Sequence, residues 1–348
     1  MTRRTAIAGL GAMLSVPSIK AADADAPDLI KARALKKGDT VGLITPATFV
    51  SDPDRIALAE RTLDYFGLAM KLGRNVRKRT GYVGGTAEER VEDLHEMFRD
   101  PKVDAIFVIR GGYGSMHLLD RLDYDLIARN PKIFLGYSDI TSLHLSIHQK
   151  TGLVTFHGPV TLSRFTDYTQ RHFVEALFEA KPLGTLANPK ESNLLRPAHT
   201  VRTVQPGKAR GRLIGGNLSL ISAAMGTPYE IDTKGKIFFI EDVGEEPYSI
   251  DRMLTQMRLA GKLEAAAGII FGECNDCRPR EFRPSFDSTF SLGEVIDNIF
   301  GGLKIPVLSG LTIGHTDDQL TLPLGVMATL DADRGTLTVE EAATRPTA

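Results

Sequence analysis

The sequence predicts an α/β protein whose first part is built on a parallel sheet and whose second part is mixed α/β. From residue 37 onward, short apolar runs alternate with stretches whose apolar residues recur every three or four positions. That pattern is typical of strands alternating with amphipathic helices. Near the end it changes to two strand-like runs around Asp333, Arg334 and Gly335, which predicts an antiparallel hairpin.

The elements of the first part follow in a regular order. We expect strand 40–45, helices 53–66 and 86–98, strand 105–109, a helix beginning at Ser115, strand 132–135, helix 139–149 and strand 153–156. Helix 86–98 has the clearest start, because Thr86 and Glu89 have the spacing of a capping box. Strands and helices alternating at this spacing predict a parallel sheet with right-handed crossovers.

Residues 181–207 are rich in proline, asparagine and other polar residues and show little periodicity, which predicts a linker. This linker separates an N-terminal domain over 37–180 from a C-terminal domain over 208–345. In the second domain we expect strand 211–214, a helix from Asn217, strand 236–240, helix 248–259, strand 268–271 and the hairpin of 319–330 with 336–340. Two domains are also what a chain of 348 residues predicts.

The N-terminus has the pattern of an export signal. Arg3 and Arg4 precede a weakly apolar run over 6–16, and small residues suited to cleavage follow up to residue 26. The arginine pair favours a twin-arginine signal peptide over 1–26, and therefore a periplasmic protein. The alternative is an uncleaved, disordered N-terminus on a cytoplasmic protein.

Charge and cysteine content narrow the classes of function. The net charge of −1 argues against a nucleic-acid partner or a polybasic membrane surface. The only cysteines, Cys274 and Cys277, could form a redox pair, half a zinc site or two structural thiols. Zinc needs two further ligands, and none nearby has the required spacing. The sequence therefore favours structural or incidental thiols, which export would allow to oxidise, and predicts neither a metal nor a cofactor.

A glycine turn at residues 111–114 carries the strongest chemical signal. It follows the apolar strand 105–109 and precedes Ser115, so it can lift the Ser115 hydroxyl out of the sheet edge. We therefore predict that Ser115 is a nucleophile. Backbone N–H groups around Gly112 and Met116 would stabilise the oxyanion.

A serine nucleophile needs a histidine base and a carboxylate that orients it. Polar residues that follow predicted strands supply both, because the carboxyl ends of parallel strands meet at one edge. His157 and His315 both follow apolar strands, so either could be the base. Glu241 follows four apolar residues, so we expect a buried acid that requires a partner. The further polar residues at strand ends are Ser138, Asp139, Asn217 and Asp242.

Several better-known motifs are absent. The run GGYGS is not the G-x-S-x-G elbow of α/β-hydrolases. It also lacks the third glycine of a dinucleotide-binding loop. His144 and His148 have a metal-compatible spacing, but the run HLSIH lacks the glutamate of H-E-x-x-H.

Six blocks in one order nevertheless resemble the LD-carboxypeptidase family of serine peptidases. They are IRGGYGS, LGYSDIT, HGP, GGNLS, FIEDVGEEPYSIDRML and GLTIGHTDDQLTLPLG, spread over about residues 37–340. The resemblance implies a Rossmann-like N-terminal domain, a mixed C-terminal domain and an active site in the cleft between them. It also implies Ser115 as nucleophile, His315 as base, Glu241 as the orienting residue, a homodimer, and no metal or cofactor.

The family resemblance further implies a substrate. Typical members cut the L,D-amide between meso-diaminopimelate and the terminal D-alanine of murein tetrapeptides, usually on recycled fragments in the cytoplasm. A subgroup cleaves a microcin-like peptide–nucleotide. A third possibility is an envelope protein that binds murein peptide without cleaving it. Candidate substrate contacts are Arg110, which could bind a free carboxylate, and Tyr113, Ser138, Asp139 and Asn217.

Overall fold

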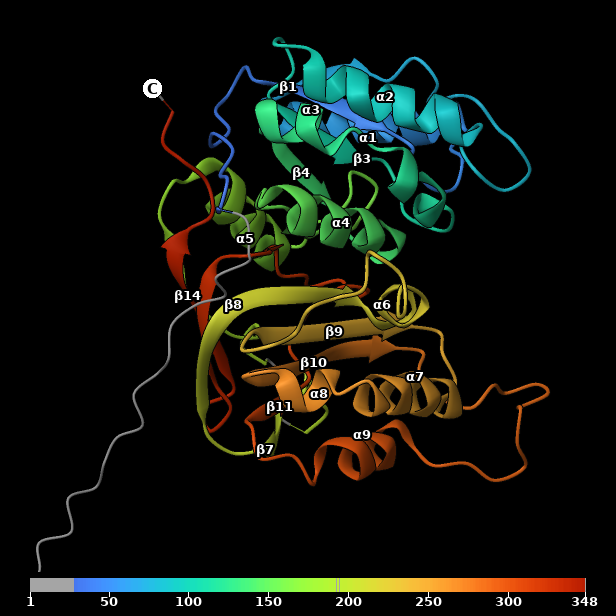
Figure 1. The fold of residues 1–348 in the computed structure, drawn as a ribbon, viewed down its shortest axis with the longest axis vertical. Coiled ribbons are helices and arrows are strands. Elements are labelled where there is room, and N and C mark those ends of the chain that lie inside the picture. Colours follow the sequence, from blue (N-terminus) through green and yellow to red (C-terminus); the bar gives the residue numbers. More distant parts are fainter. Residues whose placement is uncertain (1–27, 192, 194, 348) are drawn as a thin grey trace, which may run out of the picture.

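The chain forms two lobes, each built on its own sheet, in a computed structural model that describes residues 28–191, 193 and 195–347 (Figure 1). The predicted signal peptide at 1–26 lies outside the described residues. Within the described part of the chain, no helix has the length and apolar character needed to cross a membrane.

Lobe one contains a six-stranded sheet in the order β12-β5-β4-β3-β1-β2. Its strands are β1 (Thr40–Ile44), β2 (Ala69–Leu72), β3 (Ala105–Val108), β4 (Ile133–Gly136), β5 (Phe156–His157) and β12 (Leu322–Pro323). The first five strands pair in parallel, as the sequence predicts for the sheet, although it does not predict β2. Only β12, which comes from the end of the chain, pairs antiparallel, with β5.

Helices cover both faces of this sheet, as in a doubly wound fold. They are α1 (Pro53–Tyr65), α2 (Ala87–Arg99), α3 (Tyr124–Arg129), α4 (Thr141–Thr151) and α5 (Asp167–Phe178), with short 3₁₀ helices η1 (Ser115–Arg121) and η2 (Ser138–Ile140). Helices α1 and α5 share one apolar cluster, and α2, α3 and α4 contribute to another. The capping box of Thr86 and Glu89 at the start of α2 is confirmed. The helix expected at Ser115 is the 3₁₀ helix η1 rather than an α-helix.

Lobe two contains an eight-stranded mixed sheet in the order β6-β14-β13-β8-β9-β10-β11-β7. Its strands are β6 (Pro182–Leu186), β7 (Arg202–Gln205), β8 (Lys208–Asn217), β9 (Ile237–Val243), β10 (Gly268–Asn275), β11 (Val307–Ser309), β13 (Met327–Asp331) and β14 (Thr336–Ala342). Strands β8 to β11 run parallel. The predicted hairpin of 319–330 with 336–340 is confirmed in part: β13 and β14 form the antiparallel pair, whereas 322–323 form β12 in the sheet of lobe one. The helices are α6 (Leu218–Ala223), α7 (Pro247–Leu259), α8 (Lys262–Ala265) and α9 (Leu292–Phe300).

The expectation that residues 181–207 are only a linker is wrong. This segment supplies β6 and β7, which form the two edges of the second sheet by pairing antiparallel with β14 and β11. Neither strand has a periodic apolar pattern of its own, because an edge strand is held largely by its hydrogen-bonded neighbour. The chain thus enters lobe two earlier than its composition suggests.

Cys274 and Cys277 form a disulfide at the end of β10. The loop that follows projects from lobe two between β10 and α9 (Figure 1). The two cysteines are therefore paired, a question that the sequence left open.

Candidate functional site

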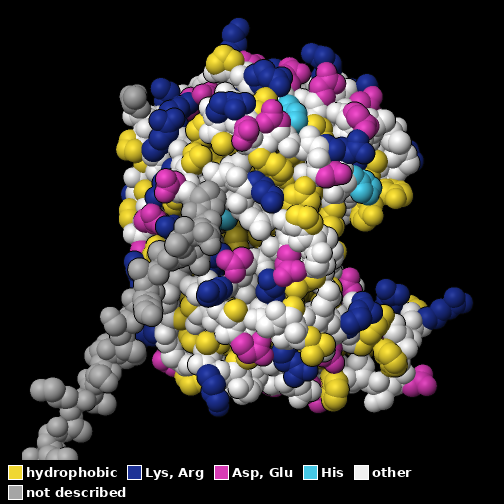
Figure 2. All heavy atoms as spheres, in the orientation of Figure 1, with side chains coloured by type: hydrophobic (Ala, Val, Ile, Leu, Met, Phe, Trp, Pro, Cys, Tyr) yellow, Lys and Arg dark blue, Asp and Glu magenta, His cyan; other side chains and the backbone are white. Residues whose placement is uncertain are grey.

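The candidate site lies where the two lobes meet, at the carboxyl ends of β4 and β9. Figure 2 shows the surface notched between the lobes. Lobe one contributes Ser138, directly after β4 and Tyr137, and lobe two contributes Glu241 from β9 and His315 from the segment after β11. The lobes are joined here by direct contact, because the hydroxyl of Thr141 in α4 accepts a hydrogen bond from the backbone N–H of Asn217 at 2.9 Å.

Glu241 and His315 form the pair that the sequence predicts. The Nδ1 atom of His315 lies 2.7 Å from Oε2 of Glu241, whose side chain is completely buried. The approach depends on Gly314, because a Cβ atom at that position would lie 2.0 Å from the same Oε2. A carboxylate on Nδ1 selects the tautomer with a proton on that nitrogen, which leaves Nε2 as an acceptor.

Two opposing effects set the pKa of His315. Burial alone would lower it, because the imidazolium ion loses hydration. The hydrogen bond and the negative charge of Glu241 outweigh burial, so the pKa of His315 is raised above its usual 6.5. The side chain retains 18% exposure, which lets the ring face the lobe boundary.

The free nitrogen of His315 faces Ser138, and not the predicted nucleophile Ser115. The Oγ of Ser138 lies 3.0 Å from Nε2 of His315. Ser138 has a φ of 66°, a left-handed conformation that is uncommon outside glycine and is often found at functional sites. A strained serine between a strand and a helical turn is also the geometry of a nucleophile elbow, although the sequence motif differs.

Ser115, the predicted nucleophile, lies away from His315 and contacts Asp139 instead. Its side chain is completely buried, and its hydroxyl donates a 2.5 Å hydrogen bond to the backbone carbonyl of Asp139. Its backbone N–H donates to the carboxylate of Asp139 at 2.8 Å, and that of Gly114 does so at 3.3 Å. The glycine turn therefore fixes Asp139, the neighbour of Ser138.

The same contacts bear on two other predicted site residues. The carboxylate of Asp139 points toward the glycine turn and accepts hydrogen bonds from the N–H groups of Gly114 and Ser115. Met116 was predicted as an oxyanion donor because it follows Ser115, and it instead lines a pocket beside η1. The residue that follows Ser138 is Asp139, whose N–H makes no hydrogen bond to any described residue, and the same is true of the N–H of Gly112.

Gly111 places the glycine turn directly against Ser138. A Cβ atom at Gly111 would lie 3.1 Å from Cβ and 3.4 Å from Oγ of Ser138. Gly112, next in the chain, has a φ of 114°, which favours glycine. The glycine turn thus lies against Ser138, whose hydroxyl faces His315.

The remaining predicted contacts fall into different positions. Asn217 is buried and caps α6, and its amide donates to Asp242 at 3.0 Å. Tyr113 is 54% exposed, and its ring stacks edge-on against Tyr82. Arg110 is partly buried, lies beside Gly112 and forms no hydrogen bond or ion pair with the described residues.

The sequence placed Ser138 among the strand-end residues and predicted it as a substrate contact, whereas the structure places its hydroxyl against His315. The glycines before Ser115 indicated a tight turn, whereas no residue in LGYSDIT predicts a left-handed backbone conformation at Ser138. The position of Ser138 in the sequence could have indicated its place in the site, because it follows the next strand of the same parallel sheet.

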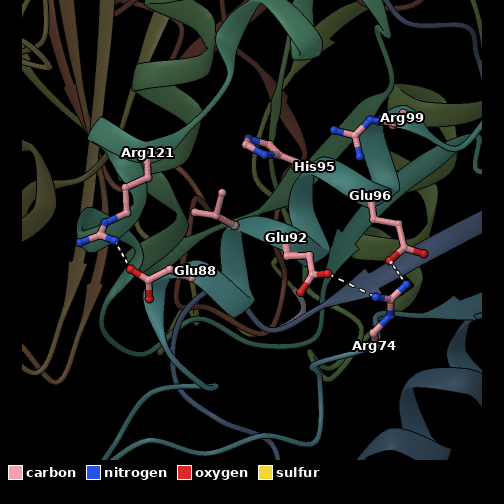
Figure 3. A pocket seen from close by; sticks show the side chains of 8 residues that line it. Arg74, Glu88, Glu92, His95, Glu96, Arg99 and Arg121 are labelled. Atoms are coloured by element: carbon pink, nitrogen blue, oxygen red, sulfur yellow. Dashed lines mark hydrogen bonds and ion pairs between the residues drawn. The ribbon is translucent and has the colours of Figure 1, made fainter.

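Other pockets have a different character. One pocket, of about 550 Å³, lies along α2. Figure 3 shows that several of its charged side chains form ion pairs with each other. Arg74 lies 3.2 Å from Glu92 and 3.5 Å from Glu96. Across the described residues, no group of three or more His, Cys, Asp or Glu side chains is arranged to hold a metal ion.

The chain is similar to known carboxypeptidases. The chain matches the LD-carboxypeptidase N-terminal domain over residues 41–158 and the LD-carboxypeptidase C-terminal domain over 210–330. It is 41% identical to the probable murein peptide carboxypeptidase of Bacillus subtilis, over 89% of this chain and 94% of that protein.

Two solved structures share the two-lobed fold. The microcin C7 self-immunity protein MccF, known as a sequence relative from Escherichia coli, matches with a TM-score of 0.82 and 30% identity, over 91% of this chain and all of that one. The muramoyltetrapeptide carboxypeptidase of Oxalobacter formigenes matches with a TM-score of 0.75 and 28% identity, over 88% of this chain and all of that one. This chain is therefore a member of the LD-carboxypeptidase family and a serine-type carboxypeptidase.

Proposed function

We propose that this protein hydrolyses the L,D-amide bond between meso-diaminopimelate and the terminal D-alanine of murein tetrapeptides. The observation that carries the proposal is the chain of contacts from Ser138 through His315 to Glu241, at 3.0 and 2.7 Å. These are the nucleophile, base and orienting acid of a serine hydrolase. Relatives named murein peptide and murein tetrapeptide carboxypeptidases support the substrate.

In the first step, Oγ of Ser138 attacks the carbonyl carbon of the scissile amide while Nε2 of His315 takes the hydroxyl proton. Glu241 holds the imidazole in the required tautomer and stabilises the imidazolium ion that forms. The N–H groups of Gly112 and Asp139, which make no hydrogen bond to described residues, would donate to the oxyanion.

In the second step, His315 returns the proton to the amide nitrogen, the C–N bond breaks and D-alanine leaves. Water then attacks the ester on Ser138 while His315 takes its proton. The C–O bond breaks, and Ser138 regains its proton from His315. No proton or electron is left unbalanced over the cycle.

A carboxypeptidase must also recognise the free carboxylate of its substrate, and we propose Arg110 for this task. Its guanidinium has no partner among the described side chains. A Cβ atom at Gly112 would lie 3.6 Å from Nη2 of Arg110, so the charge lies close to the proposed oxyanion donor. The carboxylate of a single terminal residue is only a few bonds from the scissile carbonyl, which suits this proximity.

The substrate proposal predicts that purified protein releases D-alanine from murein tetrapeptide and leaves the corresponding tripeptide. A pentapeptide ending in D-alanyl-D-alanine should be cut far more slowly. Its terminal amide bond follows a D-centre, whereas the bond that we expect to be cleaved is a terminal bond that follows an L-centre. Mass spectrometry of the products would check both results. Release of D-alanine from the pentapeptide alone would contradict the proposal.

A second candidate function is hydrolysis of a microcin-like peptide–nucleotide. The likeness to MccF favours it, since a structure of that protein contains aspartyl sulfamoyl adenosine. The same assay with an aspartyl or glutamyl sulfamoyl nucleoside distinguishes the two substrates. A non-catalytic murein-binding protein is disfavoured by the completed Ser138–His315–Glu241 arrangement.

Export and assembly complete the proposal. The pattern of residues 1–26 supports twin-arginine export to the periplasm, and the family resemblance supports a homodimer. Fractionation of cells and light scattering of the purified chain would test these two points.

Gly314→Ala should lower kcat/KM by about 100-fold or more, because even a 1 Å misplacement in an active site costs that much. The new methyl group would overlap Oε2 of Glu241, and the φ of +82° disfavours alanine in any case. Gly261→Ala is the matched control, since Gly261 has a φ of +71° with open space around it. Equal kinetics for the two variants would argue against a need for close approach at Gly314.

A further inference from the structure

A second histidine lies against the orienting acid and has no part in the mechanism above. His157, the last residue of β5, belongs to lobe one, and its side chain is completely buried. Its Nε2 atom is 3.8 Å from Oε1 of Glu241 in lobe two. His315 occupies Oε2, the other oxygen of the same carboxylate.

These atoms lack other partners. Both ring nitrogens of His157 and the Oε1 atom of Glu241 are buried and make no hydrogen bond within the described structure. A buried carboxylate oxygen without a donor is costly, and so is a buried imidazole N–H without an acceptor. A neutral imidazole with its proton on Nε2 offers Glu241 the donor that it lacks.

The surroundings of His157 favour this neutral form. The ring packs between Phe239, Tyr137 and His144, with ring centroids 5.4, 6.2 and 6.3 Å away. Burial lowers the pKa of His157 well below 6.5, and the nearby His144 and His315 lower it further. His157 therefore adds an N–H group beside Glu241 without adding a charge that would compete with His315.

We propose that His157 is a positioning residue for the Ser138–His315–Glu241 site, which faces Oε1 of Glu241 from lobe one with an Nε2–H group at 3.8 Å. This inference rests on the proposed function. With this role for His157, the site has two contacts across the lobe boundary: His157 with Glu241, and Ser138 with His315. A carboxylate with an N–H group at each oxygen is restricted in its rotation. Its orientation in turn fixes that of the His315 imidazole.

The role predicts a specific change in pH dependence. Activity requires neutral His315, so kcat/KM should rise with pH through the titration of His315. An N–H group at Oε1 offsets part of the negative charge of Glu241, so its loss should raise the proton affinity of His315. The titratable groups that face Glu241 are His315, His157, Tyr137 and Asp242, with His144 behind His157. Of these groups, only His157 is substituted in the experiment below.

The experiment measures the pH profile of kcat/KM for D-alanine release from murein tetrapeptide. His157→Phe, which keeps the ring volume, should move the acid limb to higher pH by up to about one unit, because it removes an N–H group that faces the Glu241 carboxylate. His157→Gln places an amide N–H near the position of Nε2 and should keep the limb where it is in the wild type. His148→Phe is the matched control, because it removes a histidine bonded only to the carbonyl of Leu153.

An unmoved acid limb in folded His157→Phe, with activity lower at every pH, would overturn the proposal and leave His157 a packing residue. Should His157→Phe fail to fold, His157→Asn takes its place, since its shorter amide cannot reach Oε1. Identical limbs for the Asn and Gln variants would then overturn it. An active Ser138→Ala would overturn the proposed function itself, whereas an inactive Ser138→Ala beside an unmoved limb overturns only the role of His157.

Discussion

Ser138→Ala is expected to lower kcat/KM for tetrapeptide cleavage by about 10⁴- to 10⁶-fold, the range for loss of a serine nucleophile. The variant keeps the Glu241–His315 pair but has no atom for His315 to deprotonate. Because Ser138 already has a left-handed backbone, alanine adds little strain to it. Steady-state rates of D-alanine release, with thermal melting to confirm folding, would measure the effect.

Ser115→Ala is the comparison that separates the two serines. It removes the hydrogen bond from a buried hydroxyl to the carbonyl of Asp139, which should cost about 1 kcal/mol of stability. Activity should fall by about tenfold or less, since the backbone N–H of Ser115 still binds the Asp139 carboxylate. A severe loss in Ser115→Ala with normal activity in Ser138→Ala would reverse the assignment.

Glu241→Gln is expected to lower kcat/KM by about 10⁴-fold, as when the acid of a serine triad is replaced by its amide. The amide can donate to Nδ1 of His315, which favours the tautomer that has its proton on Nε2 and cannot act as a base. Glu264→Gln makes the same change on the exposed surface of α8 and should leave the rate unchanged.

The pH profile of the residual activity gives this prediction a second signature. Burial lowers the pKa of His315, and the charge and hydrogen bond of Glu241 raise it by more. Without that charge the pKa falls, so neutral His315 persists to lower pH and the acid limb moves to lower pH. This direction is opposite to that expected for His157→Phe. An unmoved limb in Glu241→Gln would show that Glu241 does not control the titration of His315.

Local sequence patterns predicted much of the fold correctly. The apolar runs before Ser115 and Ser138 became parallel strands, and Thr86 with Glu89 formed the predicted capping box. These features depend on neighbours within a few residues. Strands β6 and β7 were missed because each is stabilised by a partner strand over 100 residues away in the chain.

The sequence by itself determined that a histidine and a buried acid follow strands of lobe two, and that two serines follow strands of lobe one. Glu241, placed after four apolar residues, had to be buried and to need a partner, for reasons of hydration alone. Only the tertiary structure decided which serine meets His315. Ser115 is turned toward Asp139, whereas Ser138 is held in a left-handed conformation against Gly111 and faces the other lobe. The choice depends on how two lobes pack, and no local pattern in either lobe contains that information.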